Sequence, residues 1–537
     1  MKIFSSKQFT YFVSLICLVI ITGCIFLDVN DAFLNYYLVI SDAMYLPSMY
    51  DDLIVHGNDF SGWNINPAPN FFPDIPLYFF LNAVFGNFQN ATTAYALIQT
   101  AITSLLLLGV FLQISKRGYL YATAANVLMM LLPFVHFIDN EYIFSLQLIV
   151  NSFHHSAFLN GLACLIYTFA FLNTKNKWWL GAIFIHGALG IVSDKLVLVT
   201  YIVPAFIMCA FAIRKHGKHS LYLMGTILLT FICGLVLFNQ LKTSSYINIP
   251  APHKFLAYDN IVVSIEMLAK QLGNYFSIKL VLGWMLALTL SSFIVVSVAS
   301  LKKLGSFFKV SKVAALNNEN FFQVFVAVFM LVVLIAPVLN GSYTGYDTIR
   351  YNYFTYILGV AVFPYCVFKM FRLADGRLAL GRKIIAGIGI LVVTLSALIM
   401  DLNDYSVYAD FYPNRVKELD DIAEENNLKY GVAPYGESKI ITLFSKKDLR
   451  VYTVFEDLAP WMHVSNPNWY YNEIGKPDKR AKFGFVITSS ETAESITTEK
   501  VGPITKSIEL SNFKVQITPA FGYTKGSYQP LLLGSEE

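Results

Sequence analysis

Charged residues are scarce in this chain of 537 residues. Asp, Glu, Lys and Arg together make up 14% of it, whereas soluble globular proteins carry roughly 25%. Hydrophobic residues make up 56%. The shortage of charge excludes an ordinary water-soluble enzyme. The small net charge of +4 indicates no particular partner, and we expect no nucleic-acid partner.

Cysteine is also rare and is missing from the last quarter of the chain. All of the cysteines fall in long apolar runs, at Cys17, Cys24, Cys164, Cys209, Cys233 and Cys366. No disulfide framework is indicated, and we expect these thiols to be packing residues. The sequence Ile21-Thr22-Gly23-Cys24 resembles a bacterial lipoprotein cleavage box. The alternative is that Cys24 is a buried thiol near the outer end of a first membrane span.

Long apolar runs fill most of the first 402 residues. A membrane span needs about 20 mostly apolar residues, and about eleven runs meet this criterion. They lie near 9–28, 92–114, 119–138, 153–173, 178–193, 194–213, 220–240, 278–299, 321–339, 351–371 and 383–402. The chain therefore predicts a polytopic α-helical membrane protein.

The loops between these runs alternate in charge. Every second loop is basic, with Lys or Arg before the first span and after the second, fourth, sixth, eighth and tenth. Because cytoplasmic loops carry an excess of Lys and Arg, we expect a cytoplasmic N-terminus and an extracytoplasmic C-terminus. A bacterial inner (plasma) membrane is the expected location.

Two regions of the sequence lack the long apolar runs of membrane spans. Residues 28–90 form a first external loop that is rich in aspartate and far longer than a simple connector. Within it, Tyr45, Met49, Asp52 and Leu53 share one helical face, and Ile75–Phe85 predicts an interfacial helix. Residues 403–537 have an ordinary composition. They predict a small external α/β domain, with a helix over 413–428 and strands at 430–433, 451–455, 483–487 and 513–517.

Ionisable residues near the expected outer ends of the spans are the candidates for chemistry, because such groups are costly at a membrane and are functional candidates by default. The topology brings them to one membrane face. They are Asp42, Asp139, Glu141, His154, His155, Asp194, Lys195, Asp347 and Arg350. Each also has a structural interpretation, as a helix cap, an interfacial charge or an ion pair. Acids, imidazoles and cations together suit acid/base work on an anionic, lipid-linked substrate.

The first external loop carries a series of short motifs in order. Asp42-Ala43-Met44-Tyr45 is followed by Gly57, Trp63, a proline-rich turn, Pro76-Leu77-Tyr78 and Phe85-Gly86. This order resembles membrane glycosyltransferases of the GT-C superfamily, such as protein O-mannosyltransferases and lipid A aminoarabinose transferases. Asp139-Asn140-Glu141 is similar to their second acidic motif. The resemblance covers the first four spans, and Ala43 stands where many relatives have Glu.

The resemblance implies an enzyme that transfers a sugar from a polyprenyl-phosphate donor to a glycan, lipid or protein acceptor on the outer face. Asp42 would be the catalytic base, and Arg350 and Lys195 would bind the lipid phosphate. Asp139 and Glu141 would position the acceptor or hold a divalent metal, which the sequence does not decide. The remaining substrate-binding candidates are Tyr45, Trp63, His154, His155 and Asp347.

Two other classes of protein compete with this interpretation. A flippase or transporter of lipid-linked saccharides predicts charges buried in the middle of spans and broken-helix repeats, whereas these charges gather at one face. A polysaccharide polymerase or ligase usually places its large external loop late in the chain. In the C-terminal domain, Trp461, Trp469, Tyr470 and Tyr471 either bind carbohydrate or form part of the core.

Overall fold

The computed structural model describes residues 5–244, 246–250, 258–307, 317–370, 402–488, 492–525 and 530–532, with a few single positions between 387 and 400. The chain divides into two compact units. Unit 1 consists of Met1–Val29, Ala68–Asn239 and Pro252–Tyr405. Unit 2 consists of Asn30–Pro67, Gln240–Ala251 and Ser406–Glu537. The sequence placed the border of the membrane region at residue 402, close to Tyr405, but it grouped residues 30–67 with the spans.

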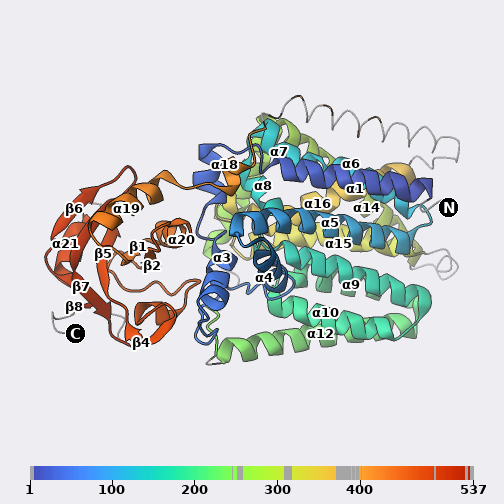
Figure 1. Cartoon of the computed structure of the whole chain (residues 1–537). Helices are drawn as coiled ribbons and strands as arrows, with labels where there is room; N and C mark the ends of the chain where they lie inside the picture. The colour runs from blue at the N-terminus through green and yellow to red at the C-terminus, as the bar shows by residue number, and fades with distance from the viewer. Residues whose placement is uncertain are drawn as a thin grey trace. The chain divides into compact units, whose positions relative to one another are not determined.

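Unit 1 is built from long apolar helices that pack against one another (Figure 1). Nine described helical segments are long and apolar enough to cross a membrane. They are α1 (Ser6–Cys24), α5 (Phe88–Ile114), α6 with α7 (Gly118–Met129 and Leu131–Asp139), α9 (His155–Thr174), a π-helical turn with α11 (Leu198–Ile202 and Val203–His216), α12 (Lys218–Thr243), α14 (Leu280–Phe307), α15 (Asn318–Leu339) and α16 (Tyr353–Met370). The chain is therefore a polytopic helical membrane protein.

The expected number of eleven spans is not confirmed. The run 178–193 forms α10 (Trp178–Ser193), an apolar helix of 16 residues that is shorter than the spanning helices. The run 383–402 lies outside the described residues, apart from a few positions. Three further helices of unit 1 are α4 (Asp74–Phe85), α8 (Tyr142–Ile149) and α13 (Ile261–Ser277). The predicted interfacial helix at 75–85 is thus present as α4.

The helices of unit 1 run in alternating directions, so the bundle has two chemically different ends. At one end, named here the Asp139 end, α7 finishes where α14 begins and α10 finishes beside the start of α9. At the opposite end, named the Lys175 end, hydrogen bonds link the end of α9 to the end of α5 and the start of α15. Several basic residues lie at this end, among them Lys175 beside His216 and Lys369 paired with Glu319.

Unit 2 contains an α/β fold around one sheet. Its strands are β1 (Tyr430–Ala433), β2 (Arg450–Thr453), β5 (Phe483–Thr488), β6 (Lys506–Glu509), β7 (Lys514–Tyr523) and β8 (Pro530–Leu532), in the order β2-β1-β5-β7-β6 with β8 beside β7. Strand β1 is parallel to β2 and β5, and β7 is antiparallel to β5. The other elements are α18 (Ser406–Ala409), α19 (Asn414–Glu425), α20 (Tyr435–Phe444), α21 (Thr492–Val501) and the hairpin of β3 (Asn472–Glu473) and β4 (Lys476–Arg480). The predicted helix and four strands are confirmed.

Residues 30–67 pack onto this fold through short helices. These are α2 (Asp31–Phe33), α3 (Tyr45–Tyr50) and two π-helical turns at Leu34–Leu38 and Asp51–Val55. Of the four residues predicted to share one helical face, Tyr45, Met49 and Asp52 are buried and Leu53 is half-buried. A buried aspartate such as Asp52 requires hydrogen-bond partners, and these come both from the early loop and from the C-terminal part of the chain.

Candidate functional site

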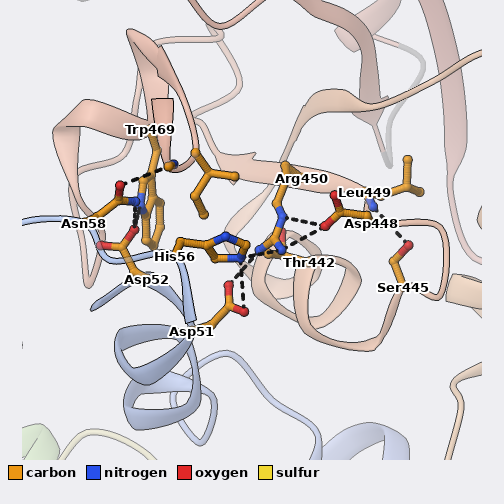
Figure 2. Close-up of polar contacts among 12 residues, drawn as sticks. Asp51, Asp52, His56, Asn58, Thr442, Ser445, Asp448, Leu449, Arg450 and Trp469 are labelled. Carbon is orange, nitrogen blue, oxygen red and sulfur yellow. Dashed lines mark hydrogen bonds and ion pairs between the residues drawn. The ribbon is translucent and has the colours of Figure 1, made fainter. Parts of the chain in front are cut away.

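Asp52 joins the early loop to the C-terminal domain within unit 2. Its carboxylate accepts hydrogen bonds from the indole nitrogens of Trp63 at 2.7 Å and Trp469 at 2.6 Å. The side-chain amides of Asn58 at 2.6 Å and Asn466 at 3.2 Å also donate to it. Figure 2 shows Asp52 and Asn58 turned toward Trp469. Trp63 is fully buried in this network, so its indole is part of the core and does not form an open sugar-binding surface.

A second polar group beside it is centred on Arg450. The Arg450 guanidinium donates to Asp51 at 2.7 Å, to Asp448 at 2.9 Å and to the ring of His56 at 2.8 Å (Figure 2). His56 also lies 3.5 Å from Asp51. Although burial opposes it, the contacts with His56 and Arg450 lower the pKa of Asp51. Asp51 is therefore an ionised partner of Arg450.

Asp42 lies in a different setting, close to α20. Its carboxylate is half-buried and accepts a hydrogen bond from the Tyr435 hydroxyl at 2.6 Å. The Ser41 hydroxyl donates to the Tyr435 carbonyl. The Lys439 ammonium lies 4.2 Å from the centre of the Tyr435 ring. Burial lowers the pKa of Lys439 to about 7, and the Asp42 charge acts in the opposite direction. Asp42 is thus a fixed carboxylate next to a buried cation.

Further aromatic rings contact Tyr435. Trp461 lies 4.8 Å from the Tyr435 ring and stacks on Phe455 at 5.2 Å and on His463 at 6.1 Å, as measured between ring centres. Phe455 is 50% exposed, and Trp461 and His463 are half-buried. Burial, together with the nearby Lys439 charge, lowers the pKa of His463. We name Phe455, Trp461 and His463 the aromatic stack.

The other aromatic candidates of the C-terminal domain belong to its interior. Trp469 is buried with its indole nitrogen on Asp52, and Tyr470 is fully buried with its hydroxyl bonded to the Thr453 carbonyl. Tyr45, which the sequence placed near the substrate, is also buried. Of the predicted cluster, Trp461 lies in the partly exposed aromatic stack and Tyr471 is half-buried, whereas the other two rings belong to the interior.

In unit 1, the central feature of the Asp139 end is a histidine–aspartate pair. His154 Nδ1 lies 2.7 Å from Asp194 Oδ2, and Asp194 Oδ1 also accepts the Leu196 amide at 2.9 Å. His154 has the left-handed backbone conformation, with φ of 68°, at the start of α9. An aspartate that accepts from Nδ1–H leaves Nε2 as the basic nitrogen of a neutral imidazole. This geometry orients His154 as a proton acceptor.

Tyr351 connects this pair to one of the predicted cations. The Tyr351 ring lies 5.5 Å from the His154 ring, between ring centres, and the Arg350 guanidinium lies 5.3 Å from the Tyr351 ring centre. Asp347 is exposed in the same short 3₁₀ turn, Tyr346–Tyr351. Lys195, next to Asp194 in the chain, lies over the Phe238 ring at 3.7 Å. The structure thus brings His154 close to the turn that carries Arg350.

Asp74 is a further acid of this region that the sequence interpretation did not select. It is buried at the start of α4 and accepts a hydrogen bond from the Tyr95 hydroxyl. Burial raises the pKa of Asp74 to about 6, and the Asp194 carboxylate raises it further while His154 lowers it. The sequence signal was an aspartate that begins an apolar helix too short to span a membrane.

Asp139 and Glu141 hold the start of α14. The Asp139 carboxylate accepts from the backbone amides of Leu280 at 2.9 Å, Val281 at 3.2 Å and Leu282 at 2.8 Å. Glu141 lies 3.8 Å from the Lys279 ammonium. A carboxylate is favoured at a helix N-terminus, where amides lack partners. These contacts give Asp139 a structural task, and its contribution to substrate binding stays a prediction.

His155, unlike its neighbour His154, is fully buried. Its ring is buried, with Nε2 at 2.9 Å from the Thr103 hydroxyl and the rings of Phe158 and Phe354 around it.

Among the described residues, no three His, Cys, Asp or Glu side chains are grouped so that they could hold a metal ion. No protein-family model and no curated protein sequence matches this chain.

Proposed function

We propose that this protein is a glycosyltransferase that moves a sugar from a polyprenyl-phosphate donor to a glycan, lipid or protein acceptor. The observation that carries the proposal is the setting of Asp42. A half-buried carboxylate, held by the Tyr435 hydroxyl at 2.6 Å, lies beside rings that lead to the partly exposed aromatic stack. Aromatic faces provide a rigid apolar surface with polar edges, which suits a sugar ring.

In this proposal Asp42 is the general base. It takes the proton from the acceptor hydroxyl as that oxygen bonds to the anomeric carbon. The bond between the anomeric carbon and the phosphate oxygen breaks, and the lipid phosphate leaves with the electron pair. Direct displacement of this kind inverts the anomeric configuration. The Tyr435 hydroxyl, which donates to the Asp42 carboxylate at 2.6 Å, fixes the orientation of the proposed base.

The leaving phosphate requires positive charge, and we assign this role to Arg350 and Lys195, as the resemblance to GT-C enzymes implies. Arg binds phosphate through two parallel hydrogen bonds, whereas Lys acts as a point charge. Both residues lie at the Asp139 end, where the His154–Asp194 pair offers a further proton acceptor. We assign the Lys175 end to the cytoplasm because its helix ends are basic.

The test is the activity of Asp42→Asn on lipid-linked sugars from cells that contain the protein. Asparagine keeps an acceptor for the Tyr435 hydroxyl but cannot take a proton, so we expect transfer to fall by at least about 100-fold. Asp31→Asn is the matched control, because Asp31 is an exposed aspartate of the same segment. Full transfer by Asp42→Asn at normal protein level would remove the base from the proposal.

The phosphate assignment is tested separately. Arg350→Ala should raise the donor concentration needed for half-maximal transfer, while the acceptor dependence stays as in the wild type. Cells that lack the protein should accumulate the polyprenyl-phosphate sugar that serves as donor. If no lipid-linked sugar accumulates in such cells, the reaction class itself is wrong.

A further inference from the structure

A buried lysine of unit 2 makes no hydrogen bond in the structure. Lys439, on α20, is 4% exposed, and its Nζ atom has no hydrogen-bond partner among the described residues. Burying an ammonium ion costs several kcal/mol unless hydrogen bonds and an opposite charge compensate for it. The Tyr435 ring face at 4.2 Å and the Asp42 charge supply only part of that compensation.

Lys439 lines a small pocket between α3, α20 and β2, which we name the Lys439 pocket. Its volume is about 20 Å³, and its lining includes Asp51, Lys439, Thr442, Arg450, Tyr452 and Trp469. A space of roughly 10–15 Å³ measured in this way admits one water molecule. The pocket therefore has room for a group with one to a few heavy atoms.

A second side chain in the lining also has no partner. The Tyr452 hydroxyl is buried and makes no hydrogen bond. Burial raises the pKa of Tyr452, so this hydroxyl keeps its proton and can donate. Two buried donors that line one pocket and lack an acceptor are rare in proteins, where nearly all buried polar atoms are paired. Both donors therefore lack an acceptor, and the pocket that they line could hold one.

The charges around the pocket indicate which charge that acceptor carries. Asp51 is the acidic side chain of the lining, and it is already bonded to Arg450 at 2.7 Å and close to His56. The Ser438 and Thr453 hydroxyls bond to each other at 2.6 Å. The Thr442 hydroxyl donates to the Val451 carbonyl and accepts the Val451 amide. The lining thus carries one positive charge, that of Lys439, beyond its internal pairs.

We propose that the Lys439 pocket binds a small monovalent anion of chloride or carboxylate size, held by the Lys439 ammonium and the Tyr452 hydroxyl. The anion is either free in solution or the carboxylate of a larger molecule such as an acidic sugar. A water molecule could accept hydrogen bonds, but it would add no negative charge to the partial compensation that Asp42 provides. Burial lowers the pKa of Lys439 to about 7, so a single bound negative charge is enough to keep the amine protonated.

The experiment uses the purified full-length protein in detergent and follows its thermal unfolding while chloride or acetate replaces a bulky sulfonate at constant ionic strength. A ligand that binds only the folded state raises the unfolding temperature in a saturable way. We expect such a rise for the wild type. Lys439→Met should abolish this rise. Tyr452→Phe should weaken the apparent affinity for the anion about tenfold, because it removes one hydrogen bond to a charged group.

Lys447→Met is the control for charge removal, because Lys447 is an exposed lysine paired with Glu424. It should respond to chloride and acetate as the wild type does. Lys439→Met should fold, since Met has a similar shape and removes a buried charge that is only partly compensated. If Lys439→Met does not fold, the Tyr452→Phe variant still tests the proposal. Equal responses of wild type and both variants, or no saturable response of the wild type, would show that the pocket holds only water.

A further arm separates the two sources of the anion. Glucuronate presents the same carboxylate on a sugar ring. A saturable response to glucuronate that depends on Lys439 assigns the pocket to the carboxylate of a larger molecule. A response restricted to chloride and acetate assigns it to free anions. Because these measurements require no transfer of sugar, they remain informative if the proposed glycosyltransferase activity fails.

Discussion

Buried carboxylates serve different purposes in the two units. In unit 1, Asp139 accepts from three successive backbone amides and so fixes one helix start. In unit 2, Asp52 accepts only from side chains, and two of these, Trp469 and Asn466, lie more than 400 positions later in the chain. Backbone amides that lose their acceptor at a helix end can bond to water or tighten the last turn. Indole and amide donors in a closed core have no such alternative. We therefore expect unit 2 to depend more strongly on its buried acid.

The largest effect predicted from this comparison is that of Asp52→Ala. The substitution leaves four donors without their acceptor, three of them on buried residues, and we expect it to cost about 3–5 kcal/mol of unfolding free energy. Denaturant unfolding followed by tryptophan fluorescence measures it directly, because Trp63 and Trp469 report on the site. Asp59→Ala is the control, since Asp59 is exposed and its carboxylate accepts, among the contacts described, only from the nearby Ser61 amide. A loss below about 1 kcal/mol for Asp52→Ala would contradict the comparison.

The sequence predicted much of each unit but not their division. The apolar runs, the α4 helix and strands β1, β2, β5 and β7 follow from local periodicity, which depends on neighbouring residues only. Strand β6 was missed because it is a polar edge strand, with three of its four residues exposed. The membership of residues 30–67 in unit 2 was also missed. It rests on the pairing of Asp51 with Arg450 and of Asp52 with Trp469, and single-sequence patterns carry no signal for contacts about 400 positions apart.

The candidate residues show the same limit. Sequence reasoning selected Asp42, His154 and Arg350 from their expected positions near span ends. It did not foresee that Asp42 lies against Tyr435 and Lys439, or that Asp194 is bonded to His154. Buried ionisable groups are defined by what surrounds them. Lys439 appears in the sequence as an ordinary lysine of an amphipathic helix, and only its burial distinguishes it.

A smaller effect on stability is expected from Asp74 in unit 1, where replacing the acid should stabilise the protein at high pH. Its pKa is raised from 3.8 to about 6, so the folded state holds its proton up to a higher pH than the unfolded state does. Stability contributed by this group therefore falls as the pH rises from about 4 to about 6, by an amount on the order of 3 kcal/mol. Asp74→Asn keeps an acceptor for the Tyr95 hydroxyl but does not titrate.

The measurement for Asp74 is the unfolding temperature of the wild type and of Asp74→Asn between pH 4.5 and pH 8. The variant should gain on the wild type as the pH rises, because it never has to bury a negative charge. Asp194 and His154 are the nearby charges that contribute to the shift. A constant difference between the two proteins across this range would mean that Asp74 has an ordinary pKa.

The smallest effect is predicted for Asp139, the unit 1 counterpart of Asp52. Asp139→Ala removes the acceptor of three amides at the start of α14, and loss of such a cap costs about 1–2 kcal/mol. Asp139→Asn should recover most of this loss, because asparagine caps helices about as well as aspartate. Thermal unfolding in detergent compares the variants. If Asp139→Ala were as damaging as Asp52→Ala, the carboxylate would be compensating more than helix amides, and the contrast between backbone-bound and side-chain-bound acids would not hold.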